Sequence, residues 1–296
     1  MNPPRVLLQP LAPASTDDEN DAVARLTAAV AEGGADALPP SARAGDLRLR
    51  LLDRVSRSAG ASRAFVTVRR RGARNAGDAV RSGVAVTVLY QATGTRLRAG
   101  EPWRTALVEL TPGTRWQAPA PRDADHSEWL VVNGSVQLAP DGGDPDPAAP
   151  HLRERDYYRR PAGTGAPIFV SADGATLYLR EAPGPQGGAD RTLIQRDAEA
   201  DWHDYAPGIR RRVLWSHAGE ASMLYDARPG AQVPQHAHGH DEECLMVDGE
   251  AFLDDVLLRR LDYQLAPAGT MHQGVSTDSG GVIFAHGDLD LDLRPD

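Results

Sequence analysis

Three histidines and one glutamate near the C-terminal end have the residue types and spacing of a metal site. His236 and His238 alternate, and side chains two residues apart on a strand share a face. Glu242 opens an apolar run that ends at Gly249, and His272 follows a Pro-Ala-Gly turn. Three imidazoles and one carboxylate suffice for a divalent first-row metal and leave positions for water or substrate. The spacing predicts one mononuclear site made by these four side chains.

Several residues beside these ligands are expected to have ordinary structural roles. His240 lies in the turn after His238 and is predicted at the surface, with a spare ligand or a proton carrier as alternatives. Glu243 should point away from the metal, into a surface contact or a contact that supports a ligand. Cys244 is expected to line the interior as a small apolar residue, where its oxidation would make redox sensing a second interpretation. His286 is expected to pack in the core or to support a ligand.

The elements that must position these residues are short strands. From residue 64 onward, apolar runs alternate with Gly, Pro and Asp turns: AFVTV, VAVTVLY, RTALVEL, EWLVV and TLYLR. This spacing predicts a sandwich or barrel of antiparallel strands. Before it, Thr16 to Glu19 reads as a capping box that opens a helix. A second helix is predicted around Leu51, where the LRLRL alternation leaves a strand as the alternative.

The strand-rich part repeats itself. TALVELTPG parallels ASMLYDARPG, WLVVNG parallels CLMVDG, and LRERDYYRRPAGTGAP parallels LRRLDYQLAPAGTMHQ, in one order along the chain. Such self-similarity predicts two copies of one β-domain. We therefore expect a disordered start and a helical region over 1–62, a first β-domain over 63–185 and a second over 190–296.

The first copy lacks the metal-binding residue types. The positions that align with the four predicted ligands hold Pro121, Asp123, Ser127 and Ala166. His126 lies near them but could not hold a metal tightly alone. The first domain is therefore expected to be metal-free, either as a structural companion or as a dry barrel for a small molecule.

The composition excludes several classes of protein. The net charge is −9, so the Arg triplets at 69–71 and 210–212 do not amount to a nucleic-acid surface. A single cysteine, Cys244, excludes a disulfide framework within one chain. No apolar run is long enough for a membrane span, and the N-terminus does not resemble a secretory signal, so a cytoplasmic protein is expected.

The spacing of the ligands resembles the cupin family. Gly230, His236-x-His238, Glu242 and Gly249 match the first cupin motif, and Pro267-x-Gly269-x-x-His272 matches the core of the second. The resemblance implies an all-β fold of two tandem cupin domains, which are jelly-roll β-barrels, with a short helical N-terminal region. It also implies that the four residues bind one divalent metal per chain, zinc or iron, with manganese or nickel as alternatives.

The second domain is more closely similar to the ChrR-like cupins, named after a zinc-dependent anti-sigma factor. The similarity lies in Trp202-x-x-Tyr205-x-Pro-Gly208, in the Glu242-Glu243 pair and in VDGEAFLDD. It implies a regulatory protein with a sigma factor or another regulatory protein as partner. The His and Cys-x-x-Cys of that family's anti-sigma domain do not occur near this N-terminus.

Three functions fit these residues. The first is a metal-dependent sensing or regulatory protein, and the second is a mononuclear Fe(II) dioxygenase acting on a small organic molecule. The third is a metal-stabilised scaffold without turnover. No acid–base pair beside the ligands assigns catalytic residues. A homodimer is suggested by the family resemblance alone.

Overall fold

The structure is a computed structural model that describes residues 49, 52, 65–69, 83–91, 104–119, 125–140, 148–184 and 191–293. Its described strands lie in one compact unit, Val66–Asp296. The described residues are nearly all β, and η1 (Asp197–Glu199) is a single 3-10 turn. The two predicted N-terminal helices lie outside these residues except for Leu49 and Leu52, as do Pro121 and Asp123. Within these ranges, the chain contains no helix long and apolar enough to cross a membrane.

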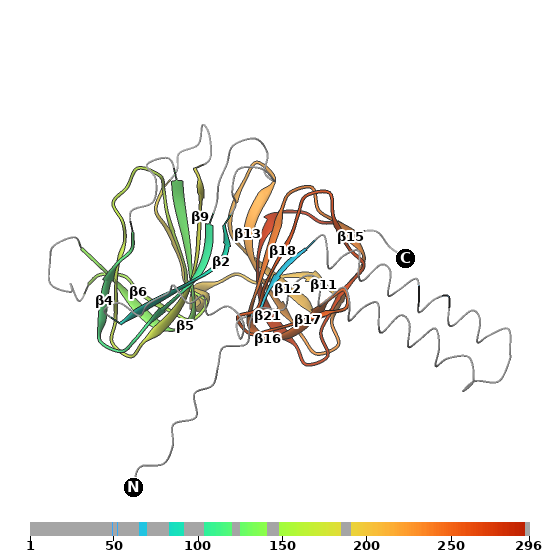
Figure 1. Cartoon of the computed structure of the whole chain (residues 1–296), viewed down its shortest axis with the longest axis horizontal. Coiled ribbons are helices and arrows are strands. Elements are labelled where there is room, and N and C mark those ends of the chain that lie inside the picture. The colour runs from blue at the N-terminus through green and yellow to red at the C-terminus, as the bar shows by residue number, and fades with distance from the viewer. Residues whose placement is uncertain are drawn as a thin grey trace, which may run out of the picture. The chain divides into compact units, whose positions relative to one another are not determined.

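The first group of strands, which we call the N-terminal half (83–184), forms a sheet in the order β7-β5-β9-β3-β2 (Figure 1). Three further strands, β4, β6 and β8, pair beside β5. The bounds are β2 Val84–Gln91, β3 Arg104–Leu110, β4 Thr114–Gln117, β5 Asp125–Ala139, β6 His151–Arg153, β7 Tyr157–Arg160, β8 Ile168–Ser171 and β9 Ala175–Pro183. Buried apolar side chains around Trp129 and Phe169 fill this half.

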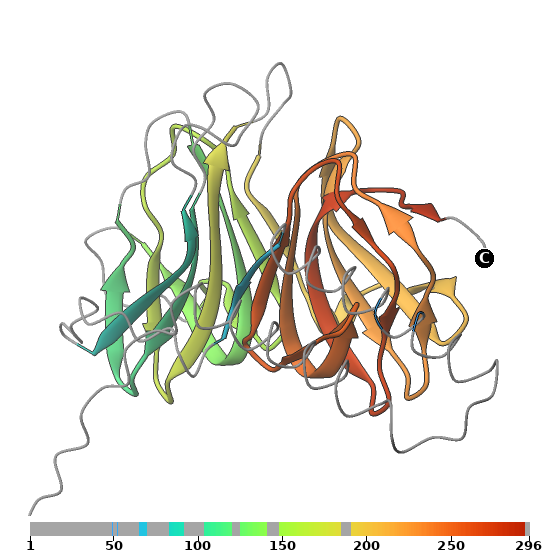
Figure 2. The ribbon, with the colours of Figure 1, turned by 45° about the vertical axis from the view of Figure 1, so that its right-hand side comes forward.

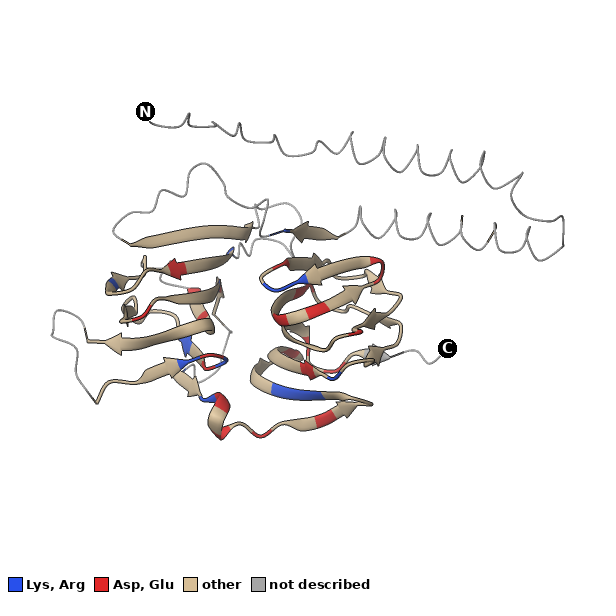
Figure 3. Cartoon of the chain, turned by 90° about the horizontal axis from the view of Figure 1, so that it is seen from below, with Lys and Arg blue, Asp and Glu red and all other residues tan. Residues whose placement is uncertain are grey.

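The second group, the C-terminal half (197–293), has the matching order β18-β16-β21-β13-β12, and β11 pairs beyond β12. The bounds are β11 His203–Ala206, β12 Ile209–His217, β13 Glu220–Ala227, β14 Gln232–Val233, β15 His236–Ala237, β16 Glu242–Leu253, β17 Val256–Arg259, β18 Tyr263–Ala266, β19 Met271–His272, β20 Val275–Ser276, β21 Gly281–Asp288 and β22 Asp292–Leu293. Strands β15, β19 and β22 form a separate small sheet. Acidic and basic residues are interspersed along the strands of both halves (Figure 3).

One glycine per half explains part of the sequence repeat. Gly134 and Gly249 have φ values of +74° and +71°, a region that disfavours other residues. A Cβ on Gly134 would lie 2.2 Å from the carbonyl oxygen of Gly174, and one on Gly249 would lie 2.3 Å from that of Gly280. The WLVVNG and CLMVDG segments therefore end in glycine because β5 and β16 approach a neighbouring turn too closely for any side chain.

The two halves exchange their edge strands. Strand β1 (Val66–Val68) precedes the N-terminal half in sequence but pairs with β18 of the C-terminal half. Strand β10 (Leu193–Gln195) precedes the C-terminal half but pairs with β7 of the N-terminal half. Figure 2 shows β1, in cyan, against the red strands. Residues 66–68 of the AFVTV run thus form a strand as predicted, although the partner strand belongs to the second half.

A buried carboxylate lies on each side of the contact between the halves. Glu128 accepts hydrogen bonds from Tyr157 of its own half and from Ser222 of the other half. Glu243 accepts them from Tyr263 of its own half and from Thr105 of the other half. The two sets are related by the sequence repeat, so the contact has approximate two-fold symmetry.

One arginine breaks that symmetry. The Arg180 guanidinium reaches both carboxylates, with Nε 2.5 Å from Glu243 Oε2 and Nη1 3.2 Å from Glu128 Oε1. Its counterpart in the C-terminal half is His286, because β9 sets Arg180 opposite Glu128 and β21 sets His286 opposite Glu243. We use the name carboxylate interface for Glu128, Glu243, Arg180 and the four side chains that donate to the two glutamates, which are Tyr157, Ser222, Tyr263 and Thr105. The separate domains predicted over 63–185 and 190–296 are thus joined by buried charge as well as by exchanged strands.

Candidate metal centre

Three short segments bring the predicted ligands together at one end of the C-terminal half. His236 lies on β15 and pairs directly with His272 on β19. His238 follows β15, and Glu242 is the first residue of β16. The ring centroids of His236, His238 and His272 lie 4.9–5.4 Å from one another. The structure therefore places all four predicted residues in one cluster.

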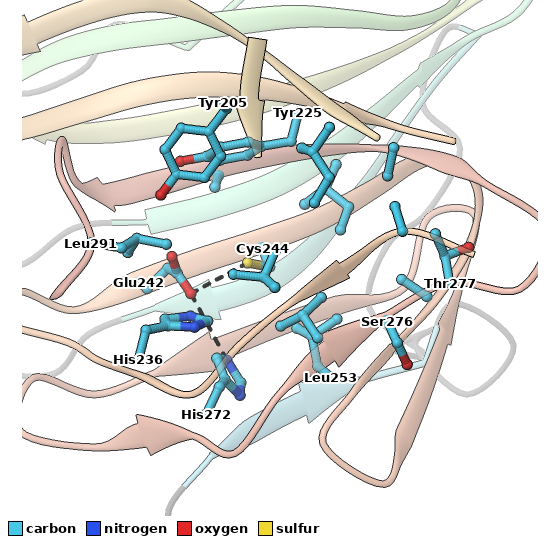
Figure 4. Close-up of a pocket in the computed structure, with 18 residues that line it drawn as sticks. Tyr205, Tyr225, His236, Glu242, Cys244, Leu253, His272, Ser276, Thr277 and Leu291 are labelled. Carbon is cyan, nitrogen blue, oxygen red and sulfur yellow. Dashed lines mark hydrogen bonds and ion pairs between the residues drawn. The ribbon is translucent and has the colours of Figure 1, made fainter. Parts of the chain in front are cut away.

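The cluster is buried and has the donor set of a metal site. Ligand atoms of His236, His238 and Glu242 all lie within 4.8 Å of one another, so these three residues could hold a metal ion. Glu242 Oε2 lies 3.6 Å from His238 Nδ1 and 3.8 Å from His272 Nε2. In Figure 4 a dashed line joins Glu242 to His272, and the His236 ring lies beside this line. His272 thus completes the arrangement as a fourth candidate ligand.

His238 gives the clearest indication that an ion belongs here. Its ring is 3% exposed, and neither Nδ1 nor Nε2 has a hydrogen-bond partner. A buried polar atom without a partner costs about 1–3 kcal/mol, so native proteins rarely contain one. Burial lowers the pKa of His238, against the opposing effect of Glu242. A neutral imidazole is the form that binds a metal, and bonding to one would satisfy the ring.

The other two histidines are oriented by contacts outside the cluster. His236 Nδ1 lies 3.0 Å from the carbonyl oxygen of Pro234, and His272 Nδ1 lies 3.0 Å from Asp254 Oδ2. Each contact engages Nδ1, the nitrogen through which carboxylates and carbonyls commonly orient histidines that bind a metal with Nε2.

Asp254 is a functional candidate that the sequence reasoning missed. Burial alone would raise the pKa of this carboxyl, but hydrogen bonds from His272 and from the backbone N–H groups of Gln273 and Gly274 hold it below its usual value. Asp254 therefore stays ionised beside His272. It lies within the VDGEAFLDD segment, whose match to a family motif was a signal without an assigned role.

Replacing Asp254 by Asn should weaken metal binding by about ten- to a hundredfold, the usual cost of removing a carboxylate that orients a ligand. The amide keeps the shape but loses the charge that favours the Nδ1–H form of His272. Competition with a chromophoric chelator measures the affinity. Asp255→Asn alters the exposed neighbour and should leave the affinity unchanged, so an equal loss in both variants would contradict the role of Asp254.

An apolar pocket of about 70 Å³ opens onto the cluster inside the C-terminal half (Figure 4). His236, Glu242 and His272 form one wall, and Leu253, Tyr205 and Tyr225 lie across from them or beside them. Cys244 lines the pocket as predicted, with Sγ 3.7 Å from Glu242 Oε2. Burial raises the pKa of the Cys244 thiol well above its usual value, and the nearby Glu242 carboxylate raises it further. The pocket can admit a small molecule to the candidate metal position.

The remaining candidates lie outside the cluster. His240 is paired with Asp288, which also accepts the N–H of Gly239 and so fixes the turn after His238. Glu243 points away from Glu242, as expected, but it is 1% exposed and lies in the carboxylate interface rather than at the surface. His286 is buried and contacts Ser222 Oγ at 2.8 Å. Burial holds the pKa of His286 well below its usual value, and the positive charge of Arg180 lowers it further.

The N-terminal half has different chemistry at the corresponding place. Ser127, which aligns with Glu242, accepts hydrogen bonds from Trp129 Nε1 at 3.0 Å and from Arg160 Nε at 3.4 Å. Its neighbour His126 contacts Glu128 and the carbonyl oxygen of Pro183, so it belongs to the interface. A buried arginine therefore occupies the surroundings in which the other half gathers imidazoles. That this half holds no metal remains a prediction.

A family model matches part of the C-terminal region of the chain. Residues 190–290 match the model of the ChrR Cupin-like domain. A putative glyoxylate induced protein from Pseudomonas aeruginosa is 13% identical with a TM-score of 0.61, over 79% of this chain and 92% of its own. A putative dioxygenase from Nostoc punctiforme is 16% identical with a TM-score of 0.50, over 73% and 88%.

A Cupin 2 conserved barrel domain protein from Leptotrichia buccalis is 11% identical with a TM-score of 0.50, over 75% of this chain and 95% of its own. At these identities the likeness shows the fold alone. The comparison with curated proteins found no match.

Proposed function

We propose that this chain, whose residues 190–290 are a ChrR cupin-like domain, is a tandem cupin that acts as a metal-dependent sensing or regulatory protein. One divalent ion, zinc or iron, would be held by His236, His238, Glu242 and His272. When bound, the ion would fix the ends of β15, β16 and β19 and offer open positions to a ligand. A sigma factor or another regulatory protein is the proposed partner, in the cytoplasm, and a homodimer is the proposed assembly.

The observation that carries this proposal is the sequence position of two glutamates on β16. Glu242 points into the metal cluster, and its neighbour Glu243 points into the carboxylate interface. Successive residues of a strand face opposite sides, so one strand end touches both places. A change at Glu242 on metal loss therefore acts on the residue that holds Arg180 of the other half.

The interface can transmit such a change because it is closely packed and charged. Arg180 contacts Glu128 as well as Glu243, and Glu128 in turn holds Tyr157 and Ser222. Buried networks of this kind have few alternative arrangements, since each broken contact leaves an unpaired polar group. Displacing Glu243 obliges the other members to rearrange, which gives a sensor its two states.

Removing the metal should accelerate amide hydrogen exchange in β5 and β9 of the N-terminal half, which contain no candidate ligand. Loosening of Glu242 would pass through Glu243 to Arg180 and Glu128. Exchange followed by mass spectrometry, with and without bound metal, measures the effect. The variant Glu243→Gln keeps the four ligands and loses the charge that holds Arg180, so the response of β9 to metal should shrink in it.

The identity of the metal bound after native purification is a second test of the proposal. Zinc without oxygen consumption supports a sensor, whereas iron with oxygen uptake on a small organic substrate would overturn it. Exchange in β5 and β9 that ignores metal removal would equally contradict coupling through β16.

A second candidate is a mononuclear Fe(II) dioxygenase, favoured by the apolar pocket that opens onto the cluster. Exclusion of water suits oxygen chemistry, and a three-histidine, one-carboxylate set leaves exchangeable positions on iron. The fold is shared with a putative dioxygenase. Within the described lining, the ionisable groups besides the candidate ligands are Cys244, Tyr205 and Tyr225.

A further inference from the structure

The pocket beside the candidate ligands has an unusual distribution of charge. Among the described residues that line it, Glu242, His236 and His272 are the only Asp, Glu, His, Lys or Arg side chains. The remainder are aliphatic, Tyr, Ser, Thr or Cys, including Val233, Leu253 and Val275. Figure 4 shows Glu242, His236 and His272 on one side of the cavity, and Leu253, Ser276 and Thr277 on the other.

The side chains at one end of the pocket are held firmly. Tyr205 lies at a bulge of edge strand β11, between the paired residues Asp204 and Ala206. Bulges redirect a side chain, and this one sets the Tyr205 ring against Tyr225 at a centroid distance of 5.3 Å. The Arg211 guanidinium lies 4.7 Å from the Tyr205 ring centroid and donates to the Leu289 carbonyl at 2.6 Å. Aromatic rings thus close this part of the pocket without lending it a charge.

We infer that the pocket takes a small organic molecule with one metal-binding oxygen group and an uncharged, apolar body. The inference rests on the proposed metal and adds the chemical class of its ligand. An oxygen group would reach the open positions of the ion beside Glu242, and the body would lie against Leu253, Val275 and the tyrosines.

The same lining disfavours molecules with a second charged group. A carboxylate on the body would move from water into a pocket whose described lining contains no Lys or Arg. Burying an unpaired charge is unfavourable, whereas burying a methylene group is favourable. The pocket should therefore discriminate between two ligands that share a metal-binding group and differ only at the far end.

A matched pair of probes tests this class. Butanohydroxamate and 3-carboxypropanohydroxamate carry the same oxygen group, and the second replaces the terminal methyl by a carboxylate. Titrating each into the full-length protein loaded with Co(II) and following the visible d–d bands gives the two dissociation constants. We expect the carboxylated probe to bind at least about tenfold more weakly. A tenfold change corresponds to about 1.4 kcal/mol, and burying an unpaired charge costs more than that.

A variant that adds a cation to the pocket checks the cause. Ser276 lines the pocket and is half-buried, so Ser276→Lys should narrow the difference between the probes or reverse it. Ser279→Lys adds the same charge at an exposed position outside the pocket and should leave the difference unchanged.

The outcomes separate the ligand class from the metal centre. Co(II) bands with equal affinities for the two probes, or with no response to either, would overturn the ligand class and leave the metal centre standing. Absence of protein-bound Co(II) bands would overturn the metal centre, and the ligand class with it. The comparison of probes on the unaltered protein decides the matter even if Ser276→Lys does not fold.

Discussion

Replacing His238 by alanine should abolish stoichiometric binding of a divalent metal. His238 has two buried nitrogens without hydrogen-bond partners, and a bound ion would give one of them a partner. Loss of a direct ligand should cost more than the about ten- to hundredfold loss typical of residues that merely orient one. Metal content after gel filtration, together with a chelator competition, measures the change.

Thermal unfolding gives a second measure of the same substitution. An ion present at about a hundred times its dissociation constant stabilises the folded state by about 2.7 kcal/mol. The unaltered protein should lose that increment on treatment with a chelator, whereas His238→Ala should not respond. His203→Ala removes an exposed histidine outside the cluster and should behave as the unaltered protein. Full metal content in His238→Ala would refute its assignment as a ligand.

Replacing Arg180 by methionine should destabilise the protein by about 3–5 kcal/mol, the usual cost of removing one partner from a buried ion pair. Burial alone would lower the pKa of Arg180, but Glu243 and Glu128 raise it, so the guanidinium stays charged. Burial would raise the pKa of Glu128, but His126, His286 and Arg180 hold it well below its usual value. Without Arg180, two buried carboxylates would face each other across the halves. Denaturant unfolding measures the loss.

The exposed pair of Arg210 and Asp226 provides the matched control. Arg210→Met breaks an arginine–carboxylate contact at the surface, where such pairs contribute about 0–1 kcal/mol. Adding Glu243→Gln to Arg180→Met removes one stranded charge and should recover part of the stability. Equal destabilisation by Arg180→Met and Arg210→Met would show that the carboxylate interface contributes no more than a surface pair.

The candidate site was predictable because its signal is local. His236, His238 and Glu242 fall within seven residues, and the alternation of a strand fixes which of them share a face. Only His272 needed a longer relation, which the resemblance to the family supplied. Asp254 was not predicted because a carboxylate that supports a histidine looks in sequence like any turn aspartate. Its role appears only when β16 and β19 are placed together.

The contact between the halves was harder to predict because its residues look ordinary one by one. Glu128 and Glu243 each stand in an apolar strand run, where alternation favours an exposed position. The repeat did contain a signal, since Glu128 and Glu243 align, as do Tyr157 and Tyr263. A glutamate kept beside a tyrosine in both copies indicates a shared environment. That the environment lies between the copies depends on tertiary packing, which neither periodicity nor composition describes.

Because β1 and β10 are exchanged, the segment that matches the family model does not coincide with one complete sheet. The match over 190–290 includes β10, which completes the other half, and excludes β1, which pairs with β18. A recombination event that carried that segment alone into another gene would deliver an unpaired strand together with an open sheet edge. Such edges promote aggregation. Selection should therefore have kept the two halves on one gene even where only one of them gathers the metal ligands.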